Sequence, residues 1–226
     1  VALFLMLIVV VPQITNIFAD SGKELPVSTE LLIGASEFAQ NHWGLILIMV
    51  AMLACGFVAF RRSKQGKYWT DLALLYIPIF GTIVKKVMVS RFSRMLASLL
   101  KSGIPIVKTL DITASAIGNE VYKKRVGYAA QDVAQGIPLG ENLSNSENLF
   151  PPMVANMILV GEKTANVTEV ANKIADFYET EVDNAVSSLS NLMEPVILVF
   201  MGASVGFIVA AIMQPIIALS DVSSVL

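Results

Sequence analysis

Two long stretches without a charged side chain constrain the fold of this 226-residue sequence more than any other feature. One runs from Trp43 to Phe60 and the other from Pro195 to Leu219. As helices rising about 1.5 Å per residue, both are long enough to cross a hydrocarbon core of about 30 Å. A buried core helix is the alternative, but uncharged runs of about 18 residues or more are typical of membrane spans. We therefore expect transmembrane helices at 43–60 and 195–219.

Composition supports a membrane protein and argues against a nucleic-acid binder. Hydrophobic residues make up 55% of the chain and charged residues only 15%, whereas soluble domains average about 25% charged residues. The 16 basic and 18 acidic side chains give a formal charge of −2. The chain thus lacks the positive field with which proteins hold polyanions, and we predict no nucleic-acid partner.

A third apolar run at the start of the sequence is shorter than the other two. It extends from Val1 to Val11 and is followed by Pro12 and polar side chains. This run is too short to cross a bilayer, and it has no basic leader of the kind found in secretory signals. We expect residues 1–17 to be the end of a membrane helix whose first half lies upstream.

The distribution of basic residues predicts how the spans are oriented. Of the 16 lysines and arginines, 15 lie between Arg61 and Glu194, and only Lys23 lies outside. Segments next to a span that are rich in Lys and Arg face the cytoplasm, and Arg61 and Arg62 directly follow the span at 43–60. We therefore expect an external loop at 18–42, a cytoplasmic domain at 61–194 and an external tail at 220–226.

The cytoplasmic segment is predicted to be entirely α-helical. Strand-like alternation is almost absent, whereas Gly and Pro punctuate the sequence at helical lengths. Gly103 is placed to cap one helix, while Pro105 and the pair Pro151 and Pro152 are placed to open others. The expected helices lie at 67–76, 89–103, 104–118, 120–135, in a short piece from Leu139, at 151–163 and at 167–193.

The last of these helices is expected to pack lengthwise against the others. Its apolar residues recur every 3.5 residues on average, which is the period of helices that cross at shallow angles. Glu194 and Pro195 mark its junction with the last span, where the proline is expected to restart or kink the helix. The predicted fold is an all-α membrane protein with a cytoplasmic bundle of the six-helix type between transmembrane helices.

No catalytic, cofactor or metal site is predicted. The phosphate-binding pattern G-x-x-x-x-G-K-[ST] is absent, and a catalytic triad would need the lone histidine, His42, at the edge of a span. The single cysteine, Cys55, excludes a disulfide within this sequence. Four carboxylates cluster on the helix at 167–193, and they are Asp176, Glu179, Glu181 and Asp183. We expect a solvated face there, with an unspecific divalent cation as the alternative.

The last span carries a row of small residues. Gly202 and Gly206 form a Gly-x-x-x-Gly pattern that Ala210 continues, which allows a second helix to approach closely. Glycine that merely faces lipid is the alternative. Neither complete span contains Asp, Glu, Lys or Arg, which ion and proton pathways usually require. A transporter or channel subunit is therefore only the alternative hypothesis for function.

Three segments together resemble one protein family. They are RFSRMLASLLKSGIPIVKTLDI at 91–112, FPPMVANMILVGEKTANVTEVANKIADFYETEVDNAV at 150–186, and NLMEPVILVFMGASVGFIVAAIMQPI at 191–216. These segments are similar to the inner-membrane platform proteins of type II secretion systems and type IV pili. The external segment ELPVSTELL adds the family's Leu-Pro-x-x-Thr pattern, so that the resemblance covers nearly the whole chain.

The resemblance implies that this chain is the C-terminal half of a bacterial inner-membrane protein with two related cytoplasmic bundles, its external segments lying in the periplasm. It implies a non-enzymatic platform that couples a cytoplasmic assembly ATPase to pilin or pseudopilin assembly. Accessory inner-membrane proteins, the lipid bilayer and further copies of the platform are the other implied partners, and no cofactor is implied. Pili and secretion systems share these motifs, so the resemblance does not separate them. The positions that carry family motifs or helix packing are Gly103, Pro105, Pro151, Pro152, Gly161, Glu162, Glu194, Pro195, Gly202 and Gly206.

One position departs from the family pattern. The family has Gly-Glu-x-x-Gly where this chain has Gly161, Glu162 and, in place of the second glycine, Ala165. A sharp turn at this point is therefore less expected than in the family. Gly161 and Glu162 are carried over as structural positions.

Overall fold

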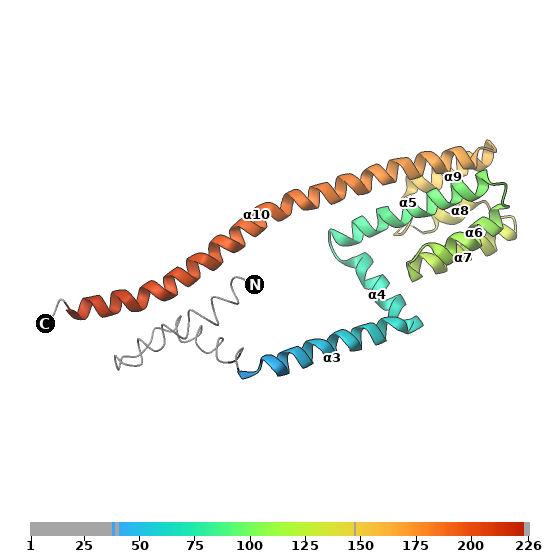
Figure 1. Cartoon of the computed structure of the whole chain (residues 1–226). Coiled ribbons are helices and arrows are strands. Elements are labelled where there is room, and N and C mark those ends of the chain that lie inside the picture. The colour runs from blue at the N-terminus through green and yellow to red at the C-terminus, as the bar shows by residue number, and fades with distance from the viewer. Residues whose placement is uncertain (1–37, 39–40, 147, 224–226) are drawn as a thin grey trace. The chain divides into compact units, whose positions relative to one another are not determined.

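Every regular element in the described part of the chain is an α-helix, which confirms the predicted all-α class (Figure 1). The structure is a computed structural model that describes residue 38, residues 41–146 and residues 148–223. Its helices are α3 (Trp43–Arg62), α4 (Lys64–Tyr76), α5 (Phe80–Lys101), α6 (Ile106–Ala116), α7 (Glu120–Ala134), α8 (Leu139–Ser144), α9 (Pro152–Lys163) and α10 (Val167–Ser223). Residues 58–191 form one compact unit, which we call the bundle. The predicted helix end at 1–17 and most of the predicted loop at 18–42 lie outside the described residues.

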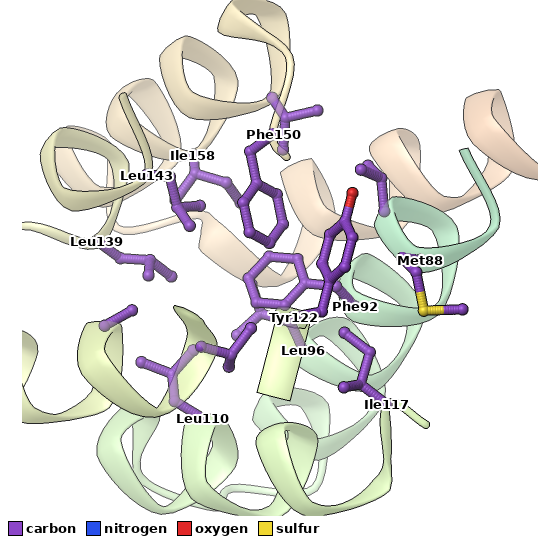
Figure 2. Packing of buried hydrophobic residues seen from close by; sticks show 14 of the residues in the cluster. Met88, Phe92, Leu96, Leu110, Ile117, Tyr122, Leu139, Leu143, Phe150 and Ile158 are labelled. Carbon is purple, nitrogen blue, oxygen red and sulfur yellow. The ribbon is translucent and has the colours of Figure 1, made fainter. Parts of the chain in front are cut away.

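An aromatic cluster lies at the centre of the bundle (Figure 2). Phe92 of α5 packs edge to face on Phe150, with ring centroids 4.9 Å apart, and Tyr122 of α7 packs on the same phenylalanine at 5.4 Å. All three side chains are buried. Such pairs contribute about 0.5–1.5 kcal/mol beyond the burial of their area. The cluster thus joins α5 and α7 to the segment that leads into α9.

The one polar atom of this cluster has a hydrogen-bond partner. The Tyr122 hydroxyl donates to the backbone oxygen of Leu149 at 2.6 Å. Burial raises the pKa of Tyr122, because the phenolate would lose its hydration. Tyr122 therefore anchors the 148–151 segment as a neutral donor.

Gly103 ends α5 in a Schellman motif. The Gly103 N–H donates to the oxygen of Leu100 at 2.9 Å, and the Ile104 N–H donates to the oxygen of Leu99 at 3.2 Å. This pattern requires a left-handed residue after the helix, and Gly103 has a φ of +79°. Glycine adopts that conformation without a Cβ clash. Pro105 then precedes the first residue of α6.

The start predicted for the second helix of the bundle is wrong. α5 begins at Phe80, nine residues before the expected start at residue 89. Between α4 and α5 the helical path is interrupted at Pro78 and Ile79. Beyond this interruption Gly81 is buried against the backbone of Leu75, and Val84 packs on the core. The apolar stripe that starts at Phe92 marks only the later turns of this helix, whereas its first turns are fixed by contact with α4.

Of the two outcomes expected at Pro195, a restart or a kink of the helix, the restart does not occur, because α10 runs from Val167 to Ser223 without a break. A proline inside a helix removes one N–H donor and crowds the carbonyl of the preceding turn. The hydrogen bonds before and after it remain, and helices in membranes commonly accommodate proline in this way. The expected boundary between residues 194 and 195 is therefore not a boundary between helices.

Two helices expose apolar side chains along the predicted spans. On α3 they include Leu45, Ile48, Leu53 and Phe57, and on α10 they include Val196, Val199, Phe200, Val205 and Phe207. In the described residues one helix, within Val167–Phe207, is long and apolar enough to cross a membrane. A second is obtained if α4 and α5, which are bent by 111° relative to each other, are counted as one broken span.

Candidate functional site

The residues singled out from the sequence do not converge on one site. Gly161 and Glu162 lie at the end of α9, where they contact α8 and α10. The remaining ones are helix-end residues (Gly103, Pro105, Pro151 and Pro152) or exposed residues of α10 (Glu194, Pro195, Gly202 and Gly206). The contact around Glu162 is therefore the best-defined candidate site.

The carboxylate of Glu162 caps the N-terminus of α8. Its Oε1 accepts a hydrogen bond from the Leu139 N–H at 2.7 Å, and its Oε2 accepts one from the Gly140 N–H at 2.9 Å. The N-cap residue of α8 is Pro138, which offers no side-chain acceptor, and α8 has only six residues. So short a helix depends on outside contacts, and a carboxylate also meets the positive end of the helix dipole. Glu162 thus supplies the cap that the sequence of α8 lacks.

Two glycines bring the backbones of α8, α9 and α10 into contact. A Cβ on Gly140 would lie 2.6 Å from the Cα of Leu159 on α9, which means that no side chain fits there. A Cβ on Gly161 would lie 3.2 Å from the Cα of Val167 at the start of α10. We call this contact, made by Gly140, Leu159, Gly161, Glu162 and Val167, the Glu162 junction. Sequence analysis missed Gly140, because nothing in the local pattern reveals the close approach of Leu159, which lies 19 residues further on.

The turn that follows Glu162 forms despite the missing glycine. Ala165 has a φ of +55°. Its N–H donates to the oxygen of Glu162 at 3.3 Å, and the Asn166 N–H donates to the oxygen of Gly161 at 2.8 Å. These bonds are those of a Schellman motif, with alanine in the left-handed position. The sharp turn is present, and the backbone strain falls on Ala165.

Basic residues of α5 bind the carboxylates of α10. Arg94 donates to Glu179 at 2.7 and 2.9 Å and to Asp176 at 2.6 Å. Lys86 donates to Glu181 at 2.7 Å. The hydrogen bonds that Arg94 donates lower the pKa of the Glu179 carboxyl, and donation to Glu179 and Asp176 raises the pKa of Arg94. Three of the four clustered carboxylates therefore hold α10 against α5.

The described residues contain no group of three or more His, Cys, Asp or Glu side chains that could hold a metal ion.

The row of small residues on α10 is open. Gly202 and Gly206 have nothing within 4 Å of where a Cβ would lie. Open space at these positions is compatible with a second helix packing there and equally with glycines that face lipid, the two alternatives that the sequence pattern allows.

The comparison with known families identifies the kind of protein that carries the Glu162 junction. Residues 92–215, which contain the whole Glu162 junction and most of the core, match the family described as type II secretion system (T2SS), protein F. The chain belongs to this family. The resemblance stated from the sequence motifs is thereby confirmed.

Curated relatives of this family occur in two kinds of machine. The chain is 40% identical over 222 residues to a type IV pilus assembly protein PilC of Thermus thermophilus, covering 98% of this chain and 55% of the relative. It is 37% identical over 219 residues to PilC of Pseudomonas aeruginosa, with coverages of 96% and 58%. A type II secretion system protein F of Pseudomonas aeruginosa is 35% identical over 214 residues, with coverages of 94% and 52%. The chain thus spans about half the length of these relatives.

Proposed function

We propose that the chain forms the membrane-bound second half of a platform protein, which couples a cytoplasmic assembly ATPase to the assembly of pilin or pseudopilin subunits. Membership of the T2SS protein F family is the observation that carries this proposal. The relatives are named for pilus assembly and for type II secretion. Accessory inner-membrane proteins and further copies of the platform are the other proposed partners.

The proposed topology places 43–60 and 195–219 across the inner membrane, 61–194 in the cytoplasm and 220–226 in the periplasm. The 15 basic residues between Arg61 and Glu194 and the exposed apolar side chains of α3 and α10 support it. A periplasm-active reporter fused after Leu226 should be active, and the same reporter inserted at Gly136 should be silent. Activity at Gly136 would contradict the topology.

The proposed role of the bundle is to pass on motion. Gly140 and Gly161 bring α8, α9 and the first turn of α10 into backbone contact, and α10 continues from the bundle into the apolar segment. Packed backbones have low compressibility, so a displacement of α8 or α9 is passed to α10 rather than absorbed. Full-length protein solubilised from membranes is expected to co-purify with a hexameric ATPase. Failure to capture that ATPase under conditions that retain other inner-membrane partners would count against coupling.

We further propose that the chain has no catalytic activity of its own. The phosphate-binding loop is absent from the sequence, and Asp176, Glu179 and Glu181 are engaged by Arg94 and Lys86. Purified protein incubated with ATP should release no phosphate above a buffer blank. A transporter or channel subunit remains the alternative, and uptake or leak of ions in vesicles that contain only this protein would favour it.

A further inference from the structure

Past Gln65 the exposed face of α4 is apolar, whereas the two charged side chains described on this helix, the buried Asp71 and the half-exposed Lys67, bind other residues of the bundle. Beyond Gln65, the exposed residues of the helix are Trp69, Ala73 and Tyr76, which follow one another at steps of four and three. Trp69 is 62% exposed and Tyr76 is 74% exposed. Helices that face water show the opposite arrangement, with the charged residues outward.

The described charged side chains of α4 are held by specific partners. Asp71 is buried, accepts a hydrogen bond from the Glu120 N–H at 2.9 Å, and lies 3.6 Å from Arg61. Lys67 binds the carboxylate of Glu120 at 3.3 Å. These contacts fix the rotation of α4 about its axis. The apolar face is therefore directed outward by the structure and is not the result of a freely turning helix.

A strained corner extends the apolar face beyond the end of α4. The Phe80 N–H donates to the oxygen of Pro78 at 2.9 Å, which makes a γ-turn centred on Ile79, with φ +71° and ψ −61°. A β-branched residue is strained in this conformation. The turn leaves Ile79 58% exposed and Phe80 52% exposed. We call Trp69, Ala73, Tyr76, Ile77, Ile79 and Phe80 the α4 apolar face.

We propose that the α4 apolar face lies in the cytoplasmic interfacial layer of the bilayer, so that α4 is a membrane-surface helix. This inference rests on the proposed function only in taking α3 as a span. α3 ends in Arg61 and Arg62, a basic pair of the kind that marks the cytoplasmic surface of a membrane. α4 begins two residues after Arg62, and the Arg61 contact with Asp71 holds its middle beside that same end of α3.

Close packing of α4 on the end of α3 supports this position. Gly66 lies against the backbone oxygen of Phe60, and no side chain would fit between them. The first turn of α4, which precedes the apolar face, is therefore packed on the last residues of α3, beside the basic pair Arg61 and Arg62. Aromatic side chains on one face and basic residues beside it are the pattern of interfacial helices, which bury that face about 5–10 Å into the boundary between headgroups and acyl chains.

A deeper, re-entrant position of α4 and α5 is disfavoured by α5. That helix carries Lys85, Lys86, Arg91, Arg94 and Lys101, and from Val84 onward it contributes Met88, Val89, Phe92, Leu96 and Ala97 to the bundle core. Charged residues inside the hydrocarbon are costly, so α5 belongs to the cytoplasm. The bend of 111° between the two helices separates the surface helix from the bundle helix.

Fluorescence quenching by brominated lipids tests the proposal. The full chain is placed in vesicles of phosphatidylcholine and phosphatidylglycerol, with bromine on the acyl chains either near the headgroup or near the chain end. Trp43→Phe leaves Trp69 as the sole tryptophan. We expect Trp69 to lose emission to the shallow bromines more than to the deep ones, with its emission maximum shifted to shorter wavelength.

Two matched probes separate failure of this inference from failure of the proposed function. In a Trp43→Phe, Trp69→Phe background, Phe57→Trp reports on α3 and Tyr128→Trp reports on an exposed position of α7. We expect quenching of the first and none of the second. Quenching at residue 57 with none at Trp69 would overturn the surface helix and leave the span intact. Equal quenching at residues 69 and 128 would contradict a membrane contact specific to the α4 apolar face. Absence of quenching at both 57 and 69 would contradict the proposed span of α3 as well.

Discussion

Glu162 at the end of α9 binds Leu139, the first residue of α8, through a hydrogen bond of 2.7 Å from the Leu139 N–H to Oε1. The two residues are far apart in the sequence, and the bond makes the start of one helix depend on the position of the next. Gly140 donates a second N–H to the same carboxylate. Because it has no side chain, it also lets the backbone of α9 at Leu159 lie against α8. The Glu162 junction therefore combines polar capping with backbone packing.

Replacing Glu162 with alanine should destabilise the bundle. The change leaves the N–H groups of Leu139 and Gly140 without their acceptor, at a cost of about 1–3 kcal/mol. Glu162→Gln retains one acceptor oxygen and should therefore lose less stability than Glu162→Ala. Thermal unfolding of the full chain in detergent, followed by circular dichroism, measures the effect. Glu141→Gln, at an exposed residue of α8, is the control, and equal melting temperatures for it and Glu162→Ala would contradict the capping role.

Adding a methyl group to Gly140 should force α8 and α9 apart. The new Cβ would overlap the backbone of Leu159, and overpacking of this kind costs about 1–3 kcal/mol. Gly127→Ala on α7 is the matched control, because a Cβ there meets nothing within 4 Å. It should raise stability by about 0.5–1 kcal/mol through the better helix propensity of alanine. If Gly140→Ala is as stable as Gly127→Ala, the close approach is wrong.

Ala165→Gly should stabilise the protein. The φ of +55° is unfavourable for alanine, and relief of that strain should contribute about 1 kcal/mol. Ala134→Gly, in the last turn of α7, should instead lower stability by up to about 1 kcal/mol. Unfolding curves of the two variants should thus shift in opposite directions from the parent, and a shared downward shift would show that residue 165 is not left-handed.

The contact between Arg94 and Glu179 should make stability depend on acid pH. Hydrogen bonds from Arg94 lower the pKa of Glu179 below its ordinary value of 4.5. The stabilising contribution is therefore present above that value and is lost as the pH falls through the lower pKa of the folded protein. Because Arg94 and Glu179 are half-exposed, we expect this contact to contribute about 1 kcal/mol or less to the free energy of unfolding.

Arg94→Gln should reduce this acid dependence of the melting temperature, whereas Lys101→Gln, at the exposed end of α5, should leave it unchanged. Identical pH profiles for the parent and both variants would mean that the ion pair does not form in solution.

Gly206→Leu should impair assembly of pili or secretion without preventing membrane insertion. Leucine is more apolar than glycine, but its side chain would hold a partner helix away at a cost on the order of 1 kcal/mol or more. Ile208→Leu, off the small-residue face in the helical pattern, should be silent. Normal assembly in both variants would mean that the Gly-x-x-x-Gly pattern reflects composition alone.

Much of the fold follows from local sequence signals, and the exceptions depend on contacts between helices. Gly103 and Pro105 end one helix and open the next through their own backbone properties, which a linear sequence reveals. The first turns of α5 were not predicted, and the restart at Pro195, one of two expected outcomes there, was wrong, because flanking structure outweighs the local signal at both places. Gly161 and Glu162 were identified by family resemblance, but their partners Gly140 and Leu139 were not, since spatial proximity leaves no periodic pattern.

The capping of α8 by Glu162 also determines how this part of the protein opens to solvent. The Leu139 and Gly140 amides are bonded to a side chain of α9 rather than to carbonyls of their own helix. Their hydrogen exchange therefore reports the undocking of α9, while amides in the middle of a helix report the loss of that helix. If α8 and α9 form one cooperative unit, these two amides should exchange at the rate of the α9 interior, well below the rate of a frayed helix end.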